Sequence, residues 1–300
     1  MSGWWLVLAC IVAGMALRGR GLSPEASSGL NRYVIAVAIP ALALRTVPDI
    51  EADPRLLLAC AGPWLVFAGA ASLWAILGPR WGLDRPTIGC LILVTGLGNT
   101  AFVGYPIVQS SYGDAGMSRA VLVDQLGSFL VFSTLGASVA RRYGGGASGS
   151  WWAILRFPPF VAFGIGLLAL LLEPLARGLK QLDPVLAPIS SSLVPVALVA
   201  LGTRVPLALP PLSPVFVGGL TYKMLLAPAL VAAGWWLLAP EALGGLTAKI
   251  SILQCAMPPM VTAAILAQDN ELRPELAAQL VGFGLPVALL STTLMIHLLG

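Results

Sequence analysis

Long apolar stretches constrain the fold of this chain more than any other sequence feature. Runs of about 20 residues, such as 54–77 and 275–299, show no alternation of polar and apolar side chains. A helix that crosses a membrane needs about 20 apolar residues, whereas membrane strands show alternating segments of about ten. Only 10% of the 300 residues are charged, and a soluble domain needs about a quarter. The sequence therefore predicts an all-α polytopic membrane protein.

Proline, glycine and charge clusters divide the chain into ten such segments. They cover residues 4–18, 28–47, 54–77, 86–112, 115–140, 151–172, 184–203, 212–238, 245–268 and 275–299. With the N-terminus outside, ten basic residues fall in cytoplasmic loops and six in outer loops. Because cytoplasmic loops are enriched in Lys and Arg, we expect a plasma-membrane protein, in bacteria of the inner membrane, with both termini on the non-cytoplasmic side.

Composition argues against several other classes of protein. The cysteines Cys10, Cys60, Cys90 and Cys255 lie inside apolar runs and His297 is the one histidine, so we expect neither a metal site nor a cofactor. The 17 basic and 13 acidic residues fit basic cytoplasmic loops better than a nucleic-acid-binding face. The motifs H-E-x-x-H and G-x-S-x-G are absent from the sequence, which leaves an intramembrane enzyme as a weak alternative without catalytic residues.

Weak internal similarity divides the chain into two halves. An offset of 155 residues places Pro40 on Pro195, Asn99 on Gln254 and Asp124 on Gln279. Between the halves lies RRYGGGASGS, residues 141–150, which has the composition of a flexible linker. We therefore expect repeats at 1–140 and 151–300, joined by a cytoplasmic linker at 141–150. An odd number of spans in each half inverts the second half across the bilayer, as in many secondary transporters.

Two segments carry glycine and proline where a spanning helix would be continuous. In the fourth segment the apolar part 86–98 is too short to cross the bilayer, and it is followed by Asn99, Gly104 and Pro106. In the ninth, Pro258-Pro259 stands at the matching place. Unwound backbone at this depth occurs where protein or a water-filled cavity satisfies it. The two breaks predict one binding site, with simple proline kinks as the plainer alternative.

Ionisable and polar side chains also fall deep inside apolar segments. Lys223 lies about ten residues inside the eighth segment, and Asp124 with Gln125 lies about two turns inside the fifth. Such residues mark transport pathways or pair with one another. Three interpretations of Lys223 remain open: a role in substrate transport, a structural ion pair with a carboxylate such as Asp124, and a misplaced helix boundary.

Three stretches of the sequence resemble the auxin efflux carrier family. They are AGMALRGRGLSPEASSGLNRYVIAVAIPALALRTV (13–47), GLGNTAFVGYPIVQSSYGDAG (96–116) and AMPPMVTAAILAQ (256–268). The first is similar to the family's opening, the second to its N-x-x-x-x-G-x-P break, and the third to its second, proline-containing break. The similarity extends over nearly the whole chain. Because the long hydrophilic loop of plant carriers is replaced by ten residues, the chain resembles a prokaryotic-type member.

The resemblance implies the fold of the bile acid and sodium symporter-like superfamily. In that fold helices 1, 2, 6 and 7 form a scaffold, helices 3–5 and 8–10 form a moving transport domain, and the broken helices 4 and 9 cross. Members of the family are associated with auxin or with malate- and malonate-like acids. Asn99 and Pro106 match the first break, and Pro258 and Pro259 lie in the second.

Departures from the family pattern limit what the resemblance implies. Gln254 stands where plant carriers have a second asparagine, which argues against auxin itself. Sodium-coupled relatives use an acidic residue near the second break, and residues 249–268 contain none, so sodium coupling is unsupported. Relatives that move in this way often dimerise through the scaffold, which leaves a homodimer open.

These observations lead to one functional hypothesis. We expect a secondary transporter of small organic anions that works by elevator-type alternating access, with a non-transporting sensor or receptor of the same fold as the alternative. The predicted substrate-binding residues are Asn99, Thr100, Gly104, Tyr105, Pro106, Gln254, Pro258, Pro259 and Thr262. The residues predicted to adjust the charge of the site or to couple transport to an ion are Lys223, Asp124 and Gln125. The coupling ion considered is a proton.

Overall fold

The structure is a computed structural model that describes residues 2–50, 53–144, 156–205 and 212–299. Within these ranges every regular element is a helix, and the only β-type pairing is one isolated bridge. Six helical stretches are long and apolar enough to cross a membrane, and four shorter apolar helices accompany them. The described chain is therefore all-helical and has the composition of a multi-pass membrane protein, as the sequence predicts.

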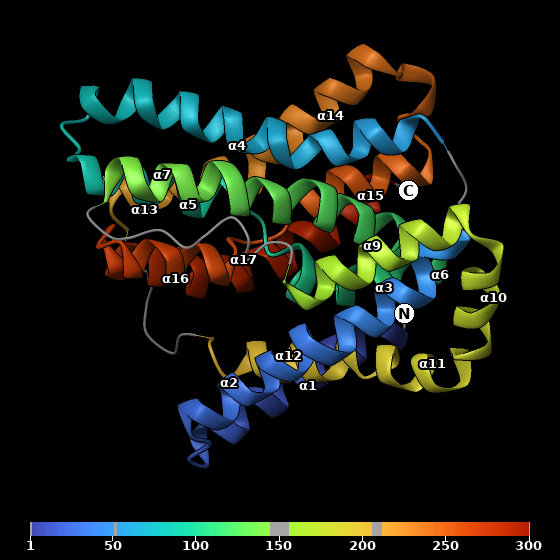
Figure 1. The fold of residues 1–300 in the computed structure, drawn as a ribbon. Helices are drawn as coiled ribbons and strands as arrows, with labels where there is room; N and C mark the ends of the chain where they lie inside the picture. Colours follow the sequence, from blue (N-terminus) through green and yellow to red (C-terminus); the bar gives the residue numbers. More distant parts are fainter. Residues whose placement is uncertain (1, 51–52, 145–155, 206–211, 300) are drawn as a thin grey trace. The chain divides into compact units, whose positions relative to one another are not determined.

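Figure 1 traces the helices in chain order. They are α1 (Ser2–Gly19), α2 (Pro24–Tyr33), η1 (Val34–Ala38), α3 (Ile39–Thr46), η2 (Val47–Asp49), α4 (Arg55–Arg80), α5 (Arg85–Gly96), η3 (Thr100–Gly104), α6 (Tyr105–Leu122), η4 (Val123–Phe129), η5 (Phe132–Gly136), α7 (Ala137–Tyr143), α9 (Pro158–Leu171), α10 (Glu173–Gln181), α11 (Asp183–Ser191), α12 (Leu193–Gly202), α13 (Pro214–Thr221), η6 (Tyr222–Leu226), α14 (Ala227–Leu238), η7 (Pro240–Ala242), α15 (Leu246–Cys255), α16 (Val261–Asp269) and α17 (Pro274–Leu299).

The chain forms two compact units. Unit 1 comprises Met1–Asp53, Ala101–Gln125 and Trp152–Val205, and unit 2 comprises Pro54–Thr100, Leu126–Trp151 and Pro206–Gly300. In unit 1, α1 packs on α12, and α3 packs on α9 and α11. In unit 2, α4, α7, α13, α16 and α17 surround α5, and α4 and α14 pack on α15. Each unit therefore draws its helices from both halves of the sequence.

The centre of unit 2 consists of two short helices that are buried along their length. In α5 every residue from Thr87 to Gly96 is buried, and in α15 the buried set includes Ser251 and Gln254. Trp74 of α4 donates an indole hydrogen bond to Thr95 Oγ1 at 3.0 Å. Because neighbouring helices enclose them, α5 and α15 can end within the protein without exposing backbone to lipid.

Several spans contain π-helical turns, and proline accounts for two of them. The turn η1 precedes Pro40 and η6 precedes Pro228. Proline lacks the N–H that a helix uses to bond the carbonyl four residues earlier, and a bond to the fifth residue bypasses this gap. The bonds from Ile39 N to Val34 O and from Ala227 N to Tyr222 O have this spacing. Such π-bulges are frequent at functional sites.

The boundary between the fourth and fifth predicted segments is visible at Gly113. Its φ of 60° and ψ of −156° interrupt the helix there, in a region of backbone space that glycine adopts readily. Helix α7 continues to Tyr143, so the first residues of the predicted linker 141–150 are helical. The remainder of the linker, 145–150, lies outside the described residues.

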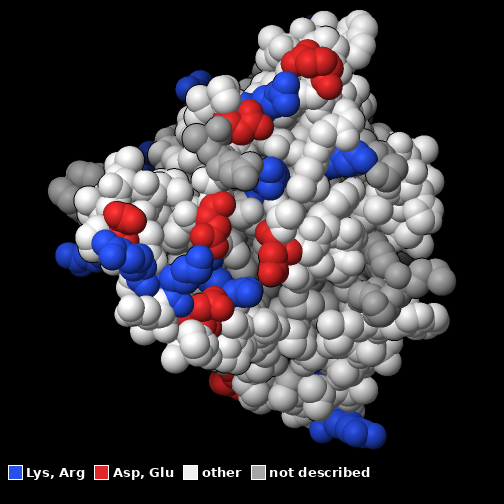
Figure 2. All heavy atoms as spheres, turned by 90° about the vertical axis from the view of Figure 1, so that its right-hand side faces the viewer, with Lys and Arg blue, Asp and Glu red and all other residues white. Residues whose placement is uncertain are grey.

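The described surface is largely apolar. Large side chains such as Leu171, Leu290 and Trp5 are 81%, 77% and 73% exposed. Figure 2 shows that charged side chains on one face gather in clusters, while wide areas between them carry none. A water-soluble monomer rarely exposes extensive apolar area, whereas lipid-facing helices require it. The surface therefore agrees with a chain that crosses the membrane several times.

Candidate functional site

Both predicted helix breaks are present. The half-helix that precedes each break, α5 or α15, belongs to unit 2. Helix α5 ends at Gly96, and Leu97 follows with extended φ and ψ of −117° and 125°. Helix α15 ends at Cys255, and the chain passes through Pro258 and Pro259 before α16 begins at Val261. Asn99, Pro258 and Pro259 lie in the observed breaks, whereas Gly104 and Pro106 lie in the helical structure that follows the first break.

The two breaks pair with one another. Gly98 and Pro259 form an isolated antiparallel bridge. The backbone N–H of Asn99 donates to the carbonyl of Pro258 at 2.7 Å, and that of Met260 donates to the carbonyl of Leu97 at 3.0 Å. Backbone groups buried away from water need partners. Each unwound segment therefore accepts a hydrogen bond from a backbone N–H of the other. These bonds hold the ends of α5 and α15 together.

Gly98 is the point of closest approach at this pairing. A Cβ atom built on it would lie 3.0 Å from Lys223 Nζ and 3.4 Å from the carbonyl oxygen of Gln254. Distances near 3.0 Å are shorter than ordinary contacts of a Cβ atom, so a side chain here would push against the lysine ammonium. The absence of a side chain at Gly98 allows the ammonium to lie directly against the first break.

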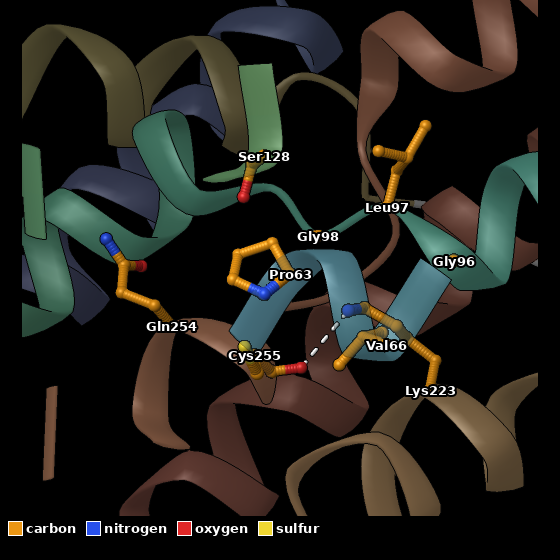
Figure 3. Close-up of a pocket in the computed structure, with 9 residues that line it drawn as sticks. All are labelled: Pro63, Val66, Gly96, Leu97, Gly98, Ser128, Lys223, Gln254 and Cys255. Carbon is orange, nitrogen blue, oxygen red and sulfur yellow. Dashed lines mark hydrogen bonds between the residues drawn. The ribbon is translucent and has the colours of Figure 1, made fainter. Parts of the chain in front are cut away.

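Lys223 reaches this point from the π-helical turn η6. Its side chain is 1% exposed, and Nζ donates to the carbonyl oxygen of Cys255 at 3.1 Å. Figure 3 shows the side chain extending from its helix toward that carbonyl. The neighbouring Tyr222 donates its hydroxyl to the carbonyl of Val66 in α4, which fixes the turn that carries the lysine. The buried ammonium thus lies at the C-terminal end of half-helix α15.

A small pocket, with space for about one water molecule, lies beside the paired breaks. It is lined by residues of α4, of both break regions, of η4 and of η6, which are Pro63, Val66, Gly96, Leu97, Gly98, Ser128, Lys223, Gln254 and Cys255. Ser128 supplies a hydroxyl, Gln254 an amide and Lys223 an ammonium, and no lining residue is acidic. The lining therefore combines an apolar wall with hydrogen-bond donors and one positive charge.

A second buried polar cluster lies in unit 1. The Tyr105 hydroxyl donates to Asp124 Oδ2 at 2.8 Å, and Gln125 Nε2 donates to the same oxygen at 2.7 Å. Asp124 is 5% exposed and Gln125 is 1% exposed. The Gln125 Oε1 atom is buried without a hydrogen bond among the described residues. Two donors therefore converge on one oxygen of this buried carboxyl group.

Comparison with known proteins assigns the family. The model of the family described as "Membrane transport protein" matches residues 5–148 and 147–296, which together span nearly all of the chain. The chain belongs to this family. The resemblance to auxin efflux carriers seen in the sequence is thereby confirmed, since an Arabidopsis thaliana protein named auxin efflux carrier component 6 is among its relatives.

Three relatives differ in how much of the chain they share. An uncharacterized transporter of Methanothermobacter thermautotrophicus is 30% identical over 297 residues, 96% of this chain and 94% of its own. An uncharacterized transporter of Methanocaldococcus jannaschii is 29% identical over 66% of each chain. The Arabidopsis carrier is 30% identical over 31% of this chain and 16% of its own. The names of the family and of its members indicate a transporter and not an enzyme.

In this transporter-family chain, the predicted substrate-binding residues fall into two groups. Asn99, Thr100, Gln254 and the paired prolines belong to unit 2, together with Lys223 and with Thr262 in the first turn of α16. Gly104, Tyr105 and Pro106 belong to unit 1, together with Asp124 and Gln125. The structure brings Lys223, Gln254 and the break at Gly98–Asn99 together, and separately brings Tyr105, Asp124 and Gln125 together.

One feature differs from the sequence expectation, and one stays untested. The first break is shorter than expected, because helical structure resumes with the π-turn η3 at Thr100 and continues in α6 from Tyr105. Thr100 and Gly104 are therefore helical. The ion pair considered between Lys223 and Asp124 joins residues of different units and remains a prediction. None of the five ion pairs within the described residues includes Lys223.

Sequence reasoning missed several residues that line the pocket. Ser128, Pro63 and Cys255 were not among the predicted site residues, yet all three border it. A partial signal exists for Pro63, because a proline inside an apolar segment marks a helix irregularity. A Cβ atom on Gly127 would lie 2.6 Å from the Pro63 ring, so this glycine permits the close packing beside Ser128. The described residues hold no cluster of three or more His, Cys, Asp or Glu side chains suited to a metal.

Proposed function

We propose that this protein is a secondary transporter of small organic anions. The observation that carries the proposal is the pairing of the two helix breaks at Gly98 and Pro259 beside a pocket with a buried ammonium. Secondary transporters bind their substrates where discontinuous helices meet near the middle of the membrane. Membership of a transport-protein family supports this interpretation over a structural use of the breaks.

The proposed architecture is an inverted repeat of five plus five transmembrane helices. The family model matches the chain in two consecutive stretches, 5–148 and 147–296, which supports a division into halves. In this arrangement α5 with α6 and α15 with α16 are the broken helices 4 and 9, and they cross at the paired breaks. The positive-inside argument then gives a plasma membrane location, in bacteria the inner membrane, with both termini outside.

The proposed ligand chemistry is recognition of a carboxylate. The N-terminus of α16, beginning at Val261 and including Thr262, provides backbone N–H groups and a partial positive charge. Asn99, Thr100 and Gln254 would add side-chain hydrogen bonds. A helix terminus stabilises an anion by about 0.3–2 kcal/mol, so several such contacts must act together. Malate- and malonate-like acids and auxin-like weak acids are the substrates we propose to test.

Transport would proceed by elevator-type alternating access. In this scheme unit 2, which carries the paired breaks and the pocket, moves as the transport domain, and unit 1 serves as scaffold. The assignment of Met1–Asp53 and Trp152–Val205 to one compact unit supports a scaffold of helices 1, 2, 6 and 7. Residues 101–125 group with that unit, although the resemblance places them in the transport domain. A homodimer through the scaffold is part of the proposal.

Proton coupling is the form of energy coupling we propose. Asp124 is a buried carboxyl group whose Oδ2 accepts hydrogen bonds from Tyr105 and Gln125. Buried carboxyl groups of this kind serve as proton sites in membrane transporters. Sodium coupling has no support, since residues 249–268 contain no acidic side chain. The described residues also hold no cluster of acidic ligands.

Ligand-dependent stability of the purified protein tests the proposal. Malonate, malate, indole-3-acetate and neutral analogues are added to protein in detergent, and the unfolding temperature is measured with and without sodium at two pH values. A bound ligand raises this temperature by mass action. We expect one carboxylate class to raise it in the wild type and not in Asn99→Ala. Asn270→Ala is the control, because Asn270 is a buried asparagine that bonds Leu266 O in α16.

Transport in proteoliposomes distinguishes the remaining outcomes. Uptake of the same carboxylate by the wild type, lost in Asn99→Ala, would establish both substrate class and site. Binding without uptake would favour the sensor or receptor alternative. Folded protein that responds to no carboxylate would contradict the organic-anion proposal.

A further inference from the structure

Lys223 is a buried positive charge whose partner is a backbone carbonyl. Its ammonium donates to Cys255 O at 3.1 Å and its side chain is 1% exposed. It takes part in none of the ion pairs of the described residues, and no acidic side chain lines its pocket. A buried charge without compensation is costly. Within unit 2, the group that accepts from the ammonium is a backbone carbonyl, and backbone dipoles can provide such compensation.

One half-helix end, that of α15, bonds the ammonium directly, and the end of α5 lies beside it. Cys255 is the last residue of α15, and Gln254 O lies on the same side, close to Gly98. Gly98 follows the last residue of α5 by two positions, and Lys223 Nζ lies against it. The C-terminus of a helix carries about half a negative elementary charge. The C-termini of α5 and α15 together carry about one negative elementary charge, which the single positive charge of the ammonium balances.

Transporters with broken helices commonly place an inorganic cation at half-helix C-termini and unwound carbonyls. Here the protein's own side chain occupies such a place. We propose that Lys223 is a tethered cation that fills a monovalent-cation site at the ends of α5 and α15, so that this site needs no cation from solution. The inference rests on the proposed function, and it explains why sodium has no acidic ligands near the second break.

The alternative role for Lys223 is direct binding of the substrate anion. The two roles predict different consequences when the charge is removed. If the ammonium serves the helix ends, its removal leaves a negative site that a small cation from solution can fill. If it serves only the substrate, its removal weakens anion binding and creates no affinity for cations.

Chemical rescue separates these roles. Lys223→Ala removes the atoms of a propylammonium ion, and Lys223→Met removes the charge while keeping most of the side-chain volume. Each variant is purified in a buffer of N-methyl-D-glucamine chloride without any organic anion, and its unfolding temperature is measured with n-propylammonium or with n-propanol. Propanol has nearly the same shape and no charge, so it controls for filling of the cavity.

We expect n-propylammonium to raise the unfolding temperature of Lys223→Ala saturably, by about 3 °C or more, and n-propanol to raise it far less. The wild type, whose site is filled, and Lys223→Met, whose cavity is occupied, should not respond. Equal effects of propylammonium and propanol on Lys223→Ala would overturn the inference. Stabilisation of the wild type by sodium over N-methyl-D-glucamine would overturn it as well.

The comparison of Lys223→Arg with Lys223→Met carries the test if Lys223→Ala does not accumulate as folded protein. Arginine keeps the charge, so we expect it to retain more of the wild-type unfolding temperature and transport than methionine does. Wild-type stability and transport in Lys223→Met would show that the site needs no charge and would overturn the inference. Because rescue is measured without organic anion, its failure is distinct from failure of the wild type to bind carboxylates.

Discussion

At the scale of single residues, the space at Gly98 decides whether the lysine ammonium can meet the paired breaks. Gly98→Ala places a Cβ atom 3.0 Å from Lys223 Nζ and 3.4 Å from Gln254 O. We expect the ammonium to shift by a few tenths of an ångström and its bond to Cys255 O to weaken. Stability should fall by less than the roughly 1.5–3 kcal/mol that a full hydrogen bond to a charged group contributes. Thermal unfolding in detergent and uptake in proteoliposomes measure the effect.

Gly164→Ala is the matched control for this substitution. Gly164 lies in α9 of unit 1, and no atom lies within 4 Å of a Cβ built on it. The same methyl group should leave the unfolding temperature unchanged or raise it slightly, since alanine favours the helix. If Gly98→Ala behaved like Gly164→Ala, the close approach of Lys223 to the break would not matter for stability.

Four of the buried polar residues lie in π-helical turns. Lys223 lies in the π-turn η6, and Asp124, Gln125 and Ser128 lie in the π-turn η4. A π-turn inserts an extra residue into a helix and so rotates the following side chains relative to the preceding ones. These turns thus allow single polar groups to face the protein interior in helices whose other residues are apolar.

At the scale of helices, unit 1 depends on a glycine contact between α1 and α12. A Cβ atom on Gly14 would overlap the carbonyl oxygen of Val199, and one on Gly202 would overlap that of Ile11. Small residues let membrane helices approach closely and gain packing energy. We expect Gly14→Ala and Gly202→Ala to separate the helices and each to lower stability by about 1–3 kcal/mol or more.

The yield of folded protein and its unfolding temperature measure this effect, again with Gly164→Ala as control. The two substitutions disturb one contact, so their combination should cost less than the sum of the single effects. Full additivity would mean that the glycines act at independent places.

The start of α5 depends on Asp84, which lies between two spans. Its Oδ1 accepts from Thr87 N at 3.0 Å, and its Oδ2 accepts from Arg273 Nη2 at 2.6 Å. Hydrogen bonding to Thr87, and then to Arg273, lowers the pKa of Asp84 below its ordinary value. Because the folded-state pKa is the lower one, the carboxylate stabilises the fold above the ordinary value of 3.8 and loses this effect as the pH falls through the folded value.

A pair of substitutions at Asp84 separates its role as the N-cap residue of α5 from the role of its charge. Asp84→Ala removes both and should lower stability by about 1 kcal/mol, as for a lost N-cap. Asp84→Asn keeps a good cap and loses an exposed ion pair, so it should cost less. Thermal unfolding near pH 7 compares the two. A larger loss in Asp84→Asn than in Asp84→Ala would contradict the assignment of Asp84 as a cap.

Sequence patterns predicted the helices and breaks because these depend on local chemistry. Proline and glycine weaken a helix locally, so the end of the apolar part 86–98 and Pro258-Pro259 marked the breaks after α5 and α15, although α4 and α17 continue through Pro63 and Pro286. Long-range partners leave no such local mark. The carbonyl of Cys255 that accepts from Lys223 is 32 positions away, and Ser128 lines the pocket from another helix. The bond from Asn99 N to Pro258 O, just before helical structure restarts at Thr100, is likewise a long-range contact.

At the scale of the whole molecule, each compact unit combines helices from both halves of the sequence. Unit 2 contains residues 54–100 and 206–300, and unit 1 contains residues 1–53 and 152–205. The backbone bonds between the breaks at Gly98 and Pro259 therefore join distant parts of the chain within one unit. An arrangement of this kind suits a protein in which each unit keeps its internal contacts during transport.

Distances between spin labels test whether the units move as rigid bodies. Labels are attached to cysteines that replace exposed leucines and a valine, in a background with Cys10, the more accessible native cysteine, changed to serine. The pair Leu57 and Leu290 lies in unit 2, and the pair Leu171 and Val185 lies in unit 1. The pair Leu57 and Leu171 joins the units.

We expect malonate, malate or indole-3-acetate, whichever raises the unfolding temperature, to leave both distance distributions within the units unchanged. The distribution between the units should shift, because a ligand that binds one state of an elevator better changes the populations of the states. In Asn99→Ala the same carboxylate should produce no shift, since that variant is expected not to bind it. A between-unit distribution that stays fixed while the wild type transports would contradict rigid-body motion, and changes within unit 2 would locate the movement at the breaks themselves.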